Sequence, residues 1–286
     1  MGRGLRSGEI QQQKLINLLQ FRRWLLGGLV CLTTMIGASG CASLRQVLGR
    51  ELVPVQTEVR LGQQLAQQVE TENTILPDAE LQRYVRLLAQ PLIDQAWADR
   101  PDIDYRITVL DDDKQVNAFA LPGGPMYVYT GLLALAADEA ELAGVLAHEL
   151  GHVVARHSAN QLATSLGVQL LVSISLGEAP EQLAQMAANL AGAGAMARFS
   201  RDDERQADDF GVRYTIAAGY DPRGLITLFD KMARLEAGGG NSLDRLLASH
   251  PATDERMARI GRRIEATAAT GERRAAQYQE MTQSLR

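Results

Sequence analysis

Cysteine is almost absent from this sequence, which has only two, Cys31 and Cys41, in 286 residues. Because both lie near the N-terminus, no disulfide is expected within the rest of the chain. No run of 18 apolar residues occurs, which argues against several membrane-spanning helices. The net charge of −5 gives no indication of a nucleic-acid partner. The composition, 46% hydrophobic and 22% charged, is ordinary for a globular protein of one or two domains.

Histidine is also scarce, because the chain has four, and His148, His152 and His157 lie close together while His250 stands apart. The segment around the first two reads as helix. Residues four apart on a helix are separated by about 6 Å of rise and about 40° of rotation, so the imidazoles of His148 and His152 converge on one point. Zinc accepts such nitrogens at about 2.0–2.1 Å. Glu149 projects beside that point and is suited to take a proton from water that the ion activates.

The alternative is a chance pairing of two histidines on a helix surface, because short motifs have a real false-positive rate. The apolar residues on both sides of His148 and His152 argue against it. They indicate a buried helix, and buried histidines require polar partners. The motif therefore predicts a hydrolytic site with one zinc ion per chain.

A zinc hydrolase needs a third protein ligand and leaves the fourth position to water. The segment 200–208 contains several carboxylates, of which Glu204 and Asp208 are one helical turn apart and share a face. One of them could bind metal while the other accepts a hydrogen bond from a ligating histidine. A solvated acidic start of a helix has the same composition, so the spacing alone leaves both interpretations open.

The hydrophobic periodicity predicts several helices and three short strands, and so a mostly helical α+β fold with a small sheet. The motif helix is expected to begin near Asp138, which caps it together with Glu141 three residues later. The chain after residue 219 is predicted to be helical and polar, ending in a helix over 266–286. The other predicted helices cover residues 42–75, 78–98, 160–198 with a break at 177–180, and 200–219, and the strands cover 103–110, 116–120 and 126–130.

The first forty residues have the pattern of a bacterial lipoprotein signal peptide. Basic residues precede an apolar run over 24–38, which has the length of a signal-peptide core and is short for a membrane span. The run ends in Ala38-Ser39-Gly40-Cys41, similar to a lipobox, although Leu is more usual than Ala38. We expect residues 1–40 to be removed and Cys41 to be lipidated. The alternatives are a free thiol at Cys41 and a twin-arginine export signal at Arg22-Arg23.

Four separated motifs together resemble one family, the HtpX-like and prenyl-protease-like zinc metallopeptidases of metallopeptidase family forty-eight. They are His148–His152, Ser200–Asp208, Asn117–Gly124, and Ser249-His250-Pro251 with Arg256 six residues after the histidine. Among its members, the periplasmic lipoproteins of LoiP type and the catalytic domain of BepA type are the most similar. The resemblance implies a zincin (gluzincin) metalloprotease domain over 61–265, after a lipidated tether over 41–60, with the sheet beside the active-site helix.

The resemblance also implies roles for individual residues. Glu204 would be the third zinc ligand, and Asp208 would orient a ligating histidine. His250 would be catalytic, either stabilising the transition state or blocking the water site as a loop ligand; its alternative is a helix-capping role before Pro251. Arg256 would belong to the same active-site loop. No family role transfers to His157, which is expected to be structural.

The stretch from Asn117 to Gly124 is expected to bind substrate. In related zincins, an edge strand beside the metal pairs with an extended segment of substrate, which gives affinity through main-chain hydrogen bonds. The candidate residues are Asn117, Ala118, Phe119, Gly123 and Gly124, and the glycines permit backbone conformations closed to other residues. A simple hairpin turn would explain the same pattern, and the two interpretations are compatible.

These observations predict a lipid-anchored zinc endopeptidase on the periplasmic side of a bacterial envelope. The resemblance implies that it degrades misfolded envelope or outer-membrane proteins, acts on unfolded polypeptides and contacts the outer-membrane assembly machinery, with no nucleic-acid partner. Ala42 is not the Asp that retains lipoproteins at the inner membrane, so the outer membrane is favoured. One alternative is a chaperone or assembly factor with secondary or latent protease activity. Another is a structural metal site without turnover, although Glu149 would then have no use.

Overall fold

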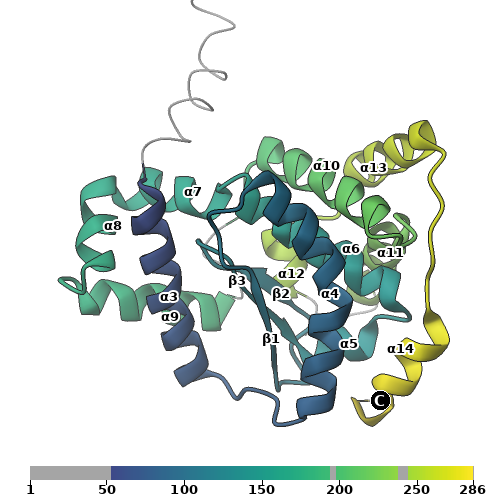
Figure 1. Ribbon diagram of the computed structural model, residues 1–286, viewed down its shortest axis with the longest axis horizontal. Helices are drawn as coiled ribbons and strands as arrows, with labels where there is room; N and C mark the ends of the chain where they lie inside the picture. The colour runs from purple at the N-terminus through teal and green to yellow at the C-terminus, as the bar shows by residue number, and fades with distance from the viewer. Residues whose placement is uncertain (1–52, 194–197, 238–243, 286) are drawn as a thin grey trace, which may run out of the picture. The chain divides into compact units, whose positions relative to one another are not determined.

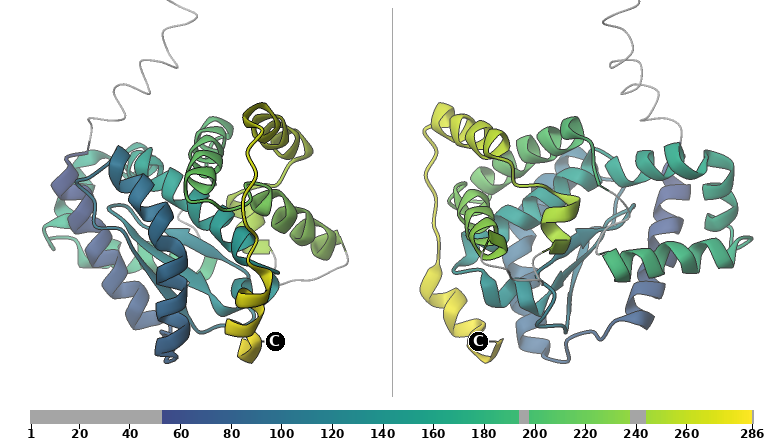
Figure 2. Two further views of the ribbon diagram at one scale, coloured as in Figure 1. Left: turned by 45° about the vertical axis from the view of Figure 1, so that its right-hand side comes forward. Right: turned by 180° about the vertical axis from the view of Figure 1, so that it is seen from behind.

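In the computed structural model, residues 53–193, 198–237 and 244–285 are described, and they belong to one compact unit, Leu52–Arg286. The predicted signal peptide and Cys41 lie outside the described residues. Most of the chain is helical, as expected for the mostly helical α+β fold (Figures 1 and 2). The elements are α3 (Val55–Glu72), α4 (Ala79–Asp99), β1 (Arg106–Leu110), β2 (Ala118–Ala120), β3 (Pro125–Tyr129), α5 (Thr130–Leu135), α6 (Glu139–Val154), α7 (His157–Leu166), α8 (Val168–Ser175), α9 (Pro180–Ala193), α10 (Arg201–Ala217), α11 (Gly224–Ala237), α12 (Asp244–Ser249), α13 (Asp254–Thr267), α14 (Ala275–Met281) and the 3₁₀ helix η1 (Gln283–Leu285).

The three strands form one sheet in the order β1-β3-β2, with β1 parallel and β2 antiparallel to β3. All three strands were predicted, and each is shorter than or offset from its expected range. The third strand ends at Tyr129 because Thr130 begins the short helix α5, which was not predicted. The segment between β2 and β3 is the hairpin turn that the sequence allowed. Both β1 and β2 lie at edges of this sheet. The backbone N–H and oxygen of Val109 in β1 are already bonded to Gln82 and Leu76, so β2 is the better candidate to pair with another chain.

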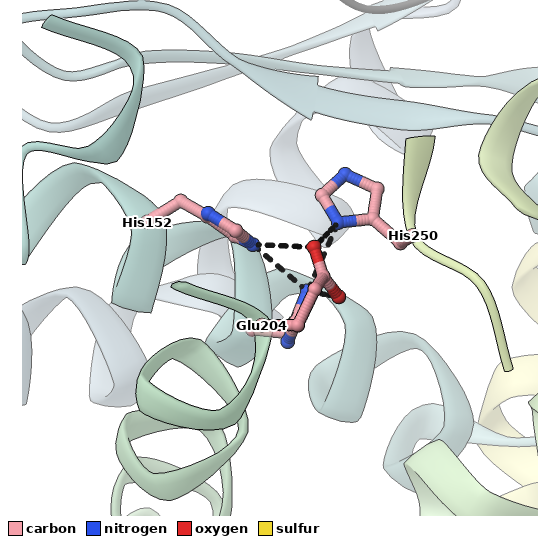
Figure 3. Close-up of side chains that lie close together, drawn as sticks. His152, Glu204 and His250 are labelled. Carbon is pink, nitrogen blue, oxygen red and sulfur yellow. Dashed lines mark hydrogen bonds and ion pairs between the residues drawn. The ribbon is translucent and has the colours of Figure 1, made fainter. Parts of the chain in front are cut away.

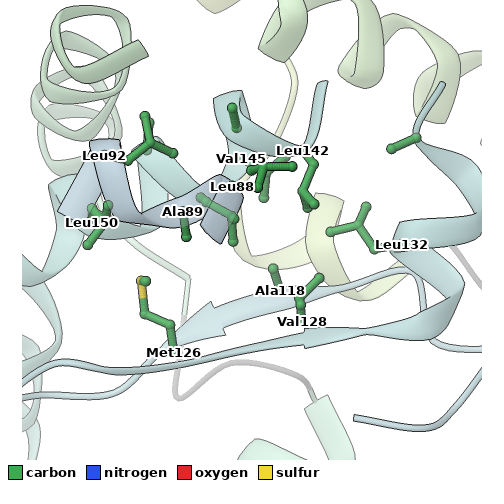
Figure 4. Close-up of a cluster of buried hydrophobic side chains, with 14 of the residues drawn as sticks. Leu88, Ala89, Leu92, Ala118, Met126, Val128, Leu132, Leu142, Val145 and Leu150 are labelled. Atoms are coloured by element: carbon green, nitrogen blue, oxygen red, sulfur yellow. The ribbon is translucent and has the colours of Figure 1, made fainter. Parts of the chain in front are cut away.

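Side-chain alternation along the strands divides the core into two layers. Met126 and Val128 of β3 face the layer formed with α4 and α6, whereas Tyr127 and Tyr129 face the layer formed with α3, α8 and α9. Figure 4 shows the first layer, with Leu88 of α4 and residues of α6 above the strands. Because both faces are covered, the short sheet is buried, and its strand β2 lies against α6.

The motif helix α6 is the central element, and every one of its side chains is buried. It begins as predicted: the carboxylate of Asp138 accepts a hydrogen bond from the backbone N–H of Glu141 at 3.0 Å. The side chain of Glu141 reaches back one residue further than in a standard capping box, to the backbone N–H of Ala137 at 2.8 Å. Both interactions satisfy donors at the buried start of the helix.

Two glycines bring α10 against α6. A Cβ atom at Gly151 would lie 2.8 Å from the backbone oxygen of Ala207, and one at Gly211 would lie 3.4 Å from Cα of His148. A larger residue at Gly151 would therefore push the two helices apart. This close approach places the acidic first turns of α10 beside the histidines of α6.

The segment 160–198 was predicted to be helical with a break at 177–180, and α8 and α9 flank that break as expected. A second break occurs at Gly167, whose φ is 82°. Apolar side chains of these helices, such as Leu162, Leu171 and Ile174, are buried against α3. These residues therefore belong to the core.

The C-terminal region differs from the single polar helix predicted over 266–286. The helix α13 ends at Thr267 and is followed by an extended stretch, α14 and η1. Tyr278 of α14 is fully buried and donates a hydrogen bond to the backbone oxygen of Leu133 at 2.8 Å. One apolar anchor therefore holds this polar segment against the core, a tertiary contact that local periodicity does not reveal.

The helix α3 is tied to the rest of the unit by a buried charge cluster. Both carboxylate oxygens of Glu58 accept hydrogen bonds from Arg100, at 3.0 and 2.7 Å, and Arg156 donates to the same carboxylate at 2.8 Å. Glu58 precedes the start of the expected 61–265 domain, so α3 contributes to the fold from its first turns. Within the described residues, no helix is both long and apolar enough to cross a bilayer.

Candidate metal centre

The two histidines of the motif converge as their helical spacing predicts. Their Nε2 atoms are 3.0 Å apart, and both residues are only 1% exposed. Burial lowers the pKa of His152, which favours the neutral imidazole, the form that binds a metal ion. The site therefore presents two buried imidazole nitrogens that face one point.

Glu204 from the first turn of α10 and His250 from the residue after α12 complete a buried group (Figure 3). The Glu204 carboxylate lies 3.6 Å from His148 Nε2 and 3.5 Å from His152 Nε2. His250 Nδ1 lies 2.8 Å from Glu204 Oε1 and 3.2 Å from His148 Nε2. The ligand atoms of all four residues lie within 4.8 Å of one another.

These donors fit zinc. A tetrahedral ion with bonds of about 2.0–2.1 Å separates its ligand atoms by about 3.3 Å, and the separations among His148, His152 and Glu204 are 3.0 to 3.6 Å. Two imidazoles and one carboxylate are also the donors of open catalytic zinc sites. The three residues are therefore the ones that would hold the ion.

Asp208 lies one turn beyond Glu204 and contacts the outer nitrogen of the first histidine. Its Oδ1 atom is 3.1 Å from His148 Nδ1, so His148 donates its Nδ1 proton and keeps Nε2 free for metal. The geometry thus separates the two carboxylates that the spacing could not distinguish: Glu204 faces the ligand nitrogens and Asp208 faces the back of the ring. The pKa of Asp208, which burial alone would raise, is held below its usual value by hydrogen bonds from His148 and Arg256.

Arg256 has a larger role than that of a loop residue. Its guanidinium donates to both Asp208 oxygens, at 2.8 and 2.6 Å, and lies 2.6 Å from Glu204 Oε2. A third bond goes to the backbone oxygen of Pro251 at 3.2 Å. Arg256 therefore links Glu204 and Asp208 of α10 to the segment that carries His250. A planar guanidinium suits this bridging geometry better than an ammonium group.

His157, expected to be only structural, contacts the second metal-site histidine. Its Nδ1 lies 2.9 Å from His152 Nδ1, and its Nε2 lies 3.2 Å from Gln206 Oε1. One choice of tautomers satisfies both contacts: His152 donates its Nδ1 proton to His157 Nδ1, and His157 donates its Nε2 proton to Gln206 Oε1. This chain leaves His152 Nε2 free for metal, as Asp208 does for His148. Sequence spacing missed it because residues five apart do not share a helix face; the left-handed Arg156 (φ 62°) turns the chain back.

Glu149 lies beside the metal-binding group and is only 3% exposed. Burial raises its pKa, whereas the nearby histidines and a hydrogen bond from the backbone N–H of Ala120 act in the opposite direction. Its Oε1 has no hydrogen-bond partner among the described residues and lies 3.5 Å from His250 Nε2. A carboxylate with a raised pKa and an open oxygen is suited to accept a proton.

His250 lies between the two acidic residues of the site. Burial lowers its pKa, but the charges of Glu149 and Glu204 outweigh that effect and raise it. Conversely, burial would raise the pKa of Glu204, but His250 and His152 lower it strongly. The helix-capping alternative accounts only for the His250 backbone, whose N–H donates to Leu246 at 2.8 Å. Its side chain belongs to the buried group.

Phe199 was not singled out from the sequence. Its ring centroid lies 4.1 Å from that of His152 and 5.4 Å from that of His250. It therefore covers one side of the metal-binding group with apolar surface. Its position directly before the N-cap Ser200 of α10 is the one signal that could have indicated it.

The predicted substrate residues divide into two groups. Asn117, Ala118 and Phe119 lie at or beside the edge strand β2, and their side chains are buried. Gly123 and Gly124 have φ of 74° and 112°, and a Cβ there would meet the backbone of Val59 or Asp104. The turn conformation and tight packing thus account for both glycines.

Comparisons with known proteins agree with this site. The sequence profile of peptidase family M48 matches residues 76–264, which is more than half of the chain. The metalloprotease LoiP of Escherichia coli is 30% identical over 210 residues, which cover 72% of this chain and 80% of that protein.

Two further relatives are longer than this chain. The mitochondrial metalloendopeptidase OMA1 of Schizosaccharomyces pombe is 31% identical over 73% of this chain and 61% of that protein. The beta-barrel assembly-enhancing protease of Yersinia pestis is 29% identical over 71% of this chain and 43% of that protein. The chain thus spans less than two thirds of either relative. With its buried metal-binding cluster of His148, His152 and Glu204, this chain belongs to peptidase family M48 and carries the metallopeptidase site of that family.

Proposed function

We propose that the protein is a zinc-dependent endopeptidase of a bacterial envelope. The observation that carries the proposal is the buried carboxylate of Glu149, which has one oxygen without a hydrogen-bond partner among the described residues and lies beside the metal-donor group of His148, His152, Glu204 and His250. A metal site used only for stability has no use for such a base. The arrangement therefore supports hydrolysis of peptide bonds.

The chain's own residues divide the chemistry among them. When bound, zinc supplies a Lewis acid that polarises a peptide carbonyl and lowers the pKa of water. Glu149 accepts the proton of the attacking water and transfers it to the leaving nitrogen. The Nε2 atom of His250 lies 3.5 Å from Glu149 Oε1, and from there it can donate a hydrogen bond to the developing oxyanion. Asp208 and His157 hold the two ligating rings in the required tautomers.

The edge strand β2 supports binding of an extended substrate. The backbone N–H of Tyr129 donates to the backbone oxygen of Asn117 at 3.0 Å, and the backbone N–H of Leu121 donates to the backbone oxygen of Pro125 at 2.8 Å. Because antiparallel bonding alternates, the backbone groups of Ala118 and Ala120 point away from β3. The N–H of Ala120 already contacts Glu149, so this edge leads directly to the proton acceptor. Since the neighbouring side chains are buried, recognition here would involve the backbone and favour unfolded segments.

The activity is tested by incubating the purified, zinc-loaded chain with unfolded casein and with a stably folded protein of similar size. We expect cleavage of casein, complete loss of cleavage with a chelator, and recovery when zinc is restored. The folded protein should remain intact, because it offers no extended segment to the edge strand. Cleavage that continues in chelator would exclude the metal-dependent mechanism.

The proposed location rests on the N-terminal pattern of residues 1–41, which lies outside the described residues. A relative named as a beta-barrel assembly-enhancing protease supports misfolded envelope or outer-membrane proteins as substrates. We expect Cys41→Ser to move the protein from the membrane fraction to the soluble periplasmic fraction, because one residue would carry the anchoring lipid. Equal membrane association of the variant and the parent would rule out this anchor.

The role proposed for His250 predicts the direction of a mutational effect. His250→Ala should lower kcat by about 10²-fold, the cost of one lost oxyanion donor, while zinc content is unchanged. Single-turnover cleavage of an unfolded substrate measures this change. A rise in basal cleavage would instead show that His250 blocks the water site as a fourth ligand and that the resting enzyme is latent.

A further inference from the structure

A cavity of about 330 Å³ opens beside the metal-binding group, and Glu204 and Phe199 belong to its wall. The residues around it come from the N-terminal parts of α10 and α13 and from the segments directly before these helices. Both helices direct their N-terminal ends toward this space, with Ser200 and Thr253 as their capping residues. The cavity is therefore adjacent to the reaction centre and near the positive ends of two helix dipoles.

The side chains around this cavity carry an excess of positive charge. Two glutamates, Glu204 and Glu255, stand against five arginines in its wall, which are Arg198, Arg201, Arg205, Arg256 and Arg259. The excess is local, because the chain as a whole has a net charge of −5. Any arginine of this wall that has no carboxylate partner would attract an anionic ligand.

Three of the arginines are already neutralised by partners. Arg256 binds Asp208 and Glu204, with contacts of 2.6 Å to each. Arg205 binds Asp202 and Glu255, at 2.9 and 3.2 Å. Arg259 binds Asp209 at 2.7 Å. These ion pairs hold the wall in place, and both of its glutamates, Glu204 and Glu255, are already paired with arginines.

Arg198 and Arg201 differ from the other three. Both are exposed, and within residues 53–193, 198–237 and 244–285 neither guanidinium has a hydrogen bond or an ion pair. The backbone of Arg198 is fixed, because its oxygen accepts a hydrogen bond from Gln161 at 3.0 Å. Arg201 is the first residue of α10, so both unpaired cations extend from positioned backbone at the cavity wall.

We propose that this cavity is a specificity subsite for a carboxylate of the substrate, with Arg198 and Arg201 as its recognising residues. The proposal rests on the proposed peptidase function, since it names a feature of the polypeptide that reaches the metal-binding group. The carboxylate belongs either to an Asp or Glu side chain near the scissile bond or to a free C-terminus. Phe199 and Pro251 supply apolar wall for the aliphatic part of a Glu side chain.

The test uses a peptide with amidated ends that the full chain cleaves at one bond, identified from the casein products by mass spectrometry. Each of the two residues on either side of that bond is replaced in turn by Glu, Gln or Lys. We expect kcat/KM at one position to be about twofold to fivefold higher for Glu than for Gln, and lower still for Lys. A shortened peptide with a free carboxylate at that position, compared with its amide, distinguishes a C-terminus from a side chain.

Variants assign the preference to the two arginines. In the double variant Arg198→Gln and Arg201→Gln, the ratio of kcat/KM for the Glu peptide to that for the Gln peptide should fall to about one. Arg201→Glu should reverse the preference toward Lys. Arg262→Gln is the matched control, because Arg262 is an exposed residue of α13 outside the cavity wall. The preference should also weaken between 0.1 and 1 M NaCl, since salt screens exposed charges.

Binding separates failure of this proposal from failure of the proposed function. Fluorescence anisotropy measures the Kd of the Glu, Gln and Lys peptides for a Glu149→Gln chain, which does not need to be active. Discrimination in binding without any casein cleavage by the parent chain would retain the subsite and reject the peptidase function. Equal kcat/KM and equal Kd for Glu and Gln at all four positions, or a preference that survives in the double variant, would overturn the subsite.

Discussion

Glu149→Gln is expected to reduce cleavage of unfolded protein by at least about 10²-fold while the fold and the zinc content remain unchanged. The amide has the size of the carboxylate and can still accept the N–H of Ala120, but it cannot take a proton. Because burial raises the pKa of Glu149, its ionised form is disfavoured in the folded protein, so removing the charge should not lower the free energy of unfolding. Initial rates on casein, zinc content and thermal midpoint measure these three properties.

The same variant distinguishes the peptidase from a chaperone or assembly factor. A chaperone that uses the edge strand β2 to hold clients keeps its cellular function and its suppression of aggregation in Glu149→Gln. A peptidase loses the cellular function together with cleavage. Full complementation by the variant in a strain that lacks the gene would therefore favour the chaperone alternative.

Arg256→Ala is expected to lower the free energy of unfolding of the metal-free protein by about 3–5 kcal/mol. The side chain is 6% exposed and donates to both oxygens of Asp208, which is fully buried. Within the described residues, its removal leaves the Asp208 carboxylate with His148 as its remaining polar partner. Zinc affinity should also fall by about 10- to 100-fold, because Asp208 would no longer orient His148 firmly.

Urea unfolding in chelator and competition with a fluorescent zinc indicator measure the two effects separately. Arg263→Ala is the control, because Arg263 lies on the same helix and pairs with Asp209 at 3.1 Å, but its side chain is 47% exposed. That change should cost no more than about 1 kcal/mol. Equal unfolding midpoints and zinc affinities for the two variants would show that the Arg256 bridge has no special role.

The amino-acid sequence alone was sufficient for the features that depend on local geometry. The convergence of His148 and His152 follows from the helical repeat, and the helix start at Asp138 follows from capping chemistry. The separate motifs were sufficient to indicate the family, which the comparisons confirmed. These predictions succeeded because each depends on residues within one or two helical turns.

Features that join distant segments were decided by the tertiary structure. Spacing could not choose between Glu204 and Asp208, and the choice follows from the close approach of α10 to α6 at Gly151 and Gly211. The strand order β1-β3-β2 pairs β1 with the third strand rather than with the second, which no local pattern encodes.

The contacts around the metal donors depend on tertiary structure in the same way. His157 reaches His152 only because Arg156 adopts a left-handed conformation between two helices. Arg256 reaches Asp208 from 48 residues away in sequence. A helix specifies which side chains share its own face, but which face meets which depends on packing of the whole core. For this reason, the sequence identified the residues that carry the chemistry, and the fold determined which partners orient them.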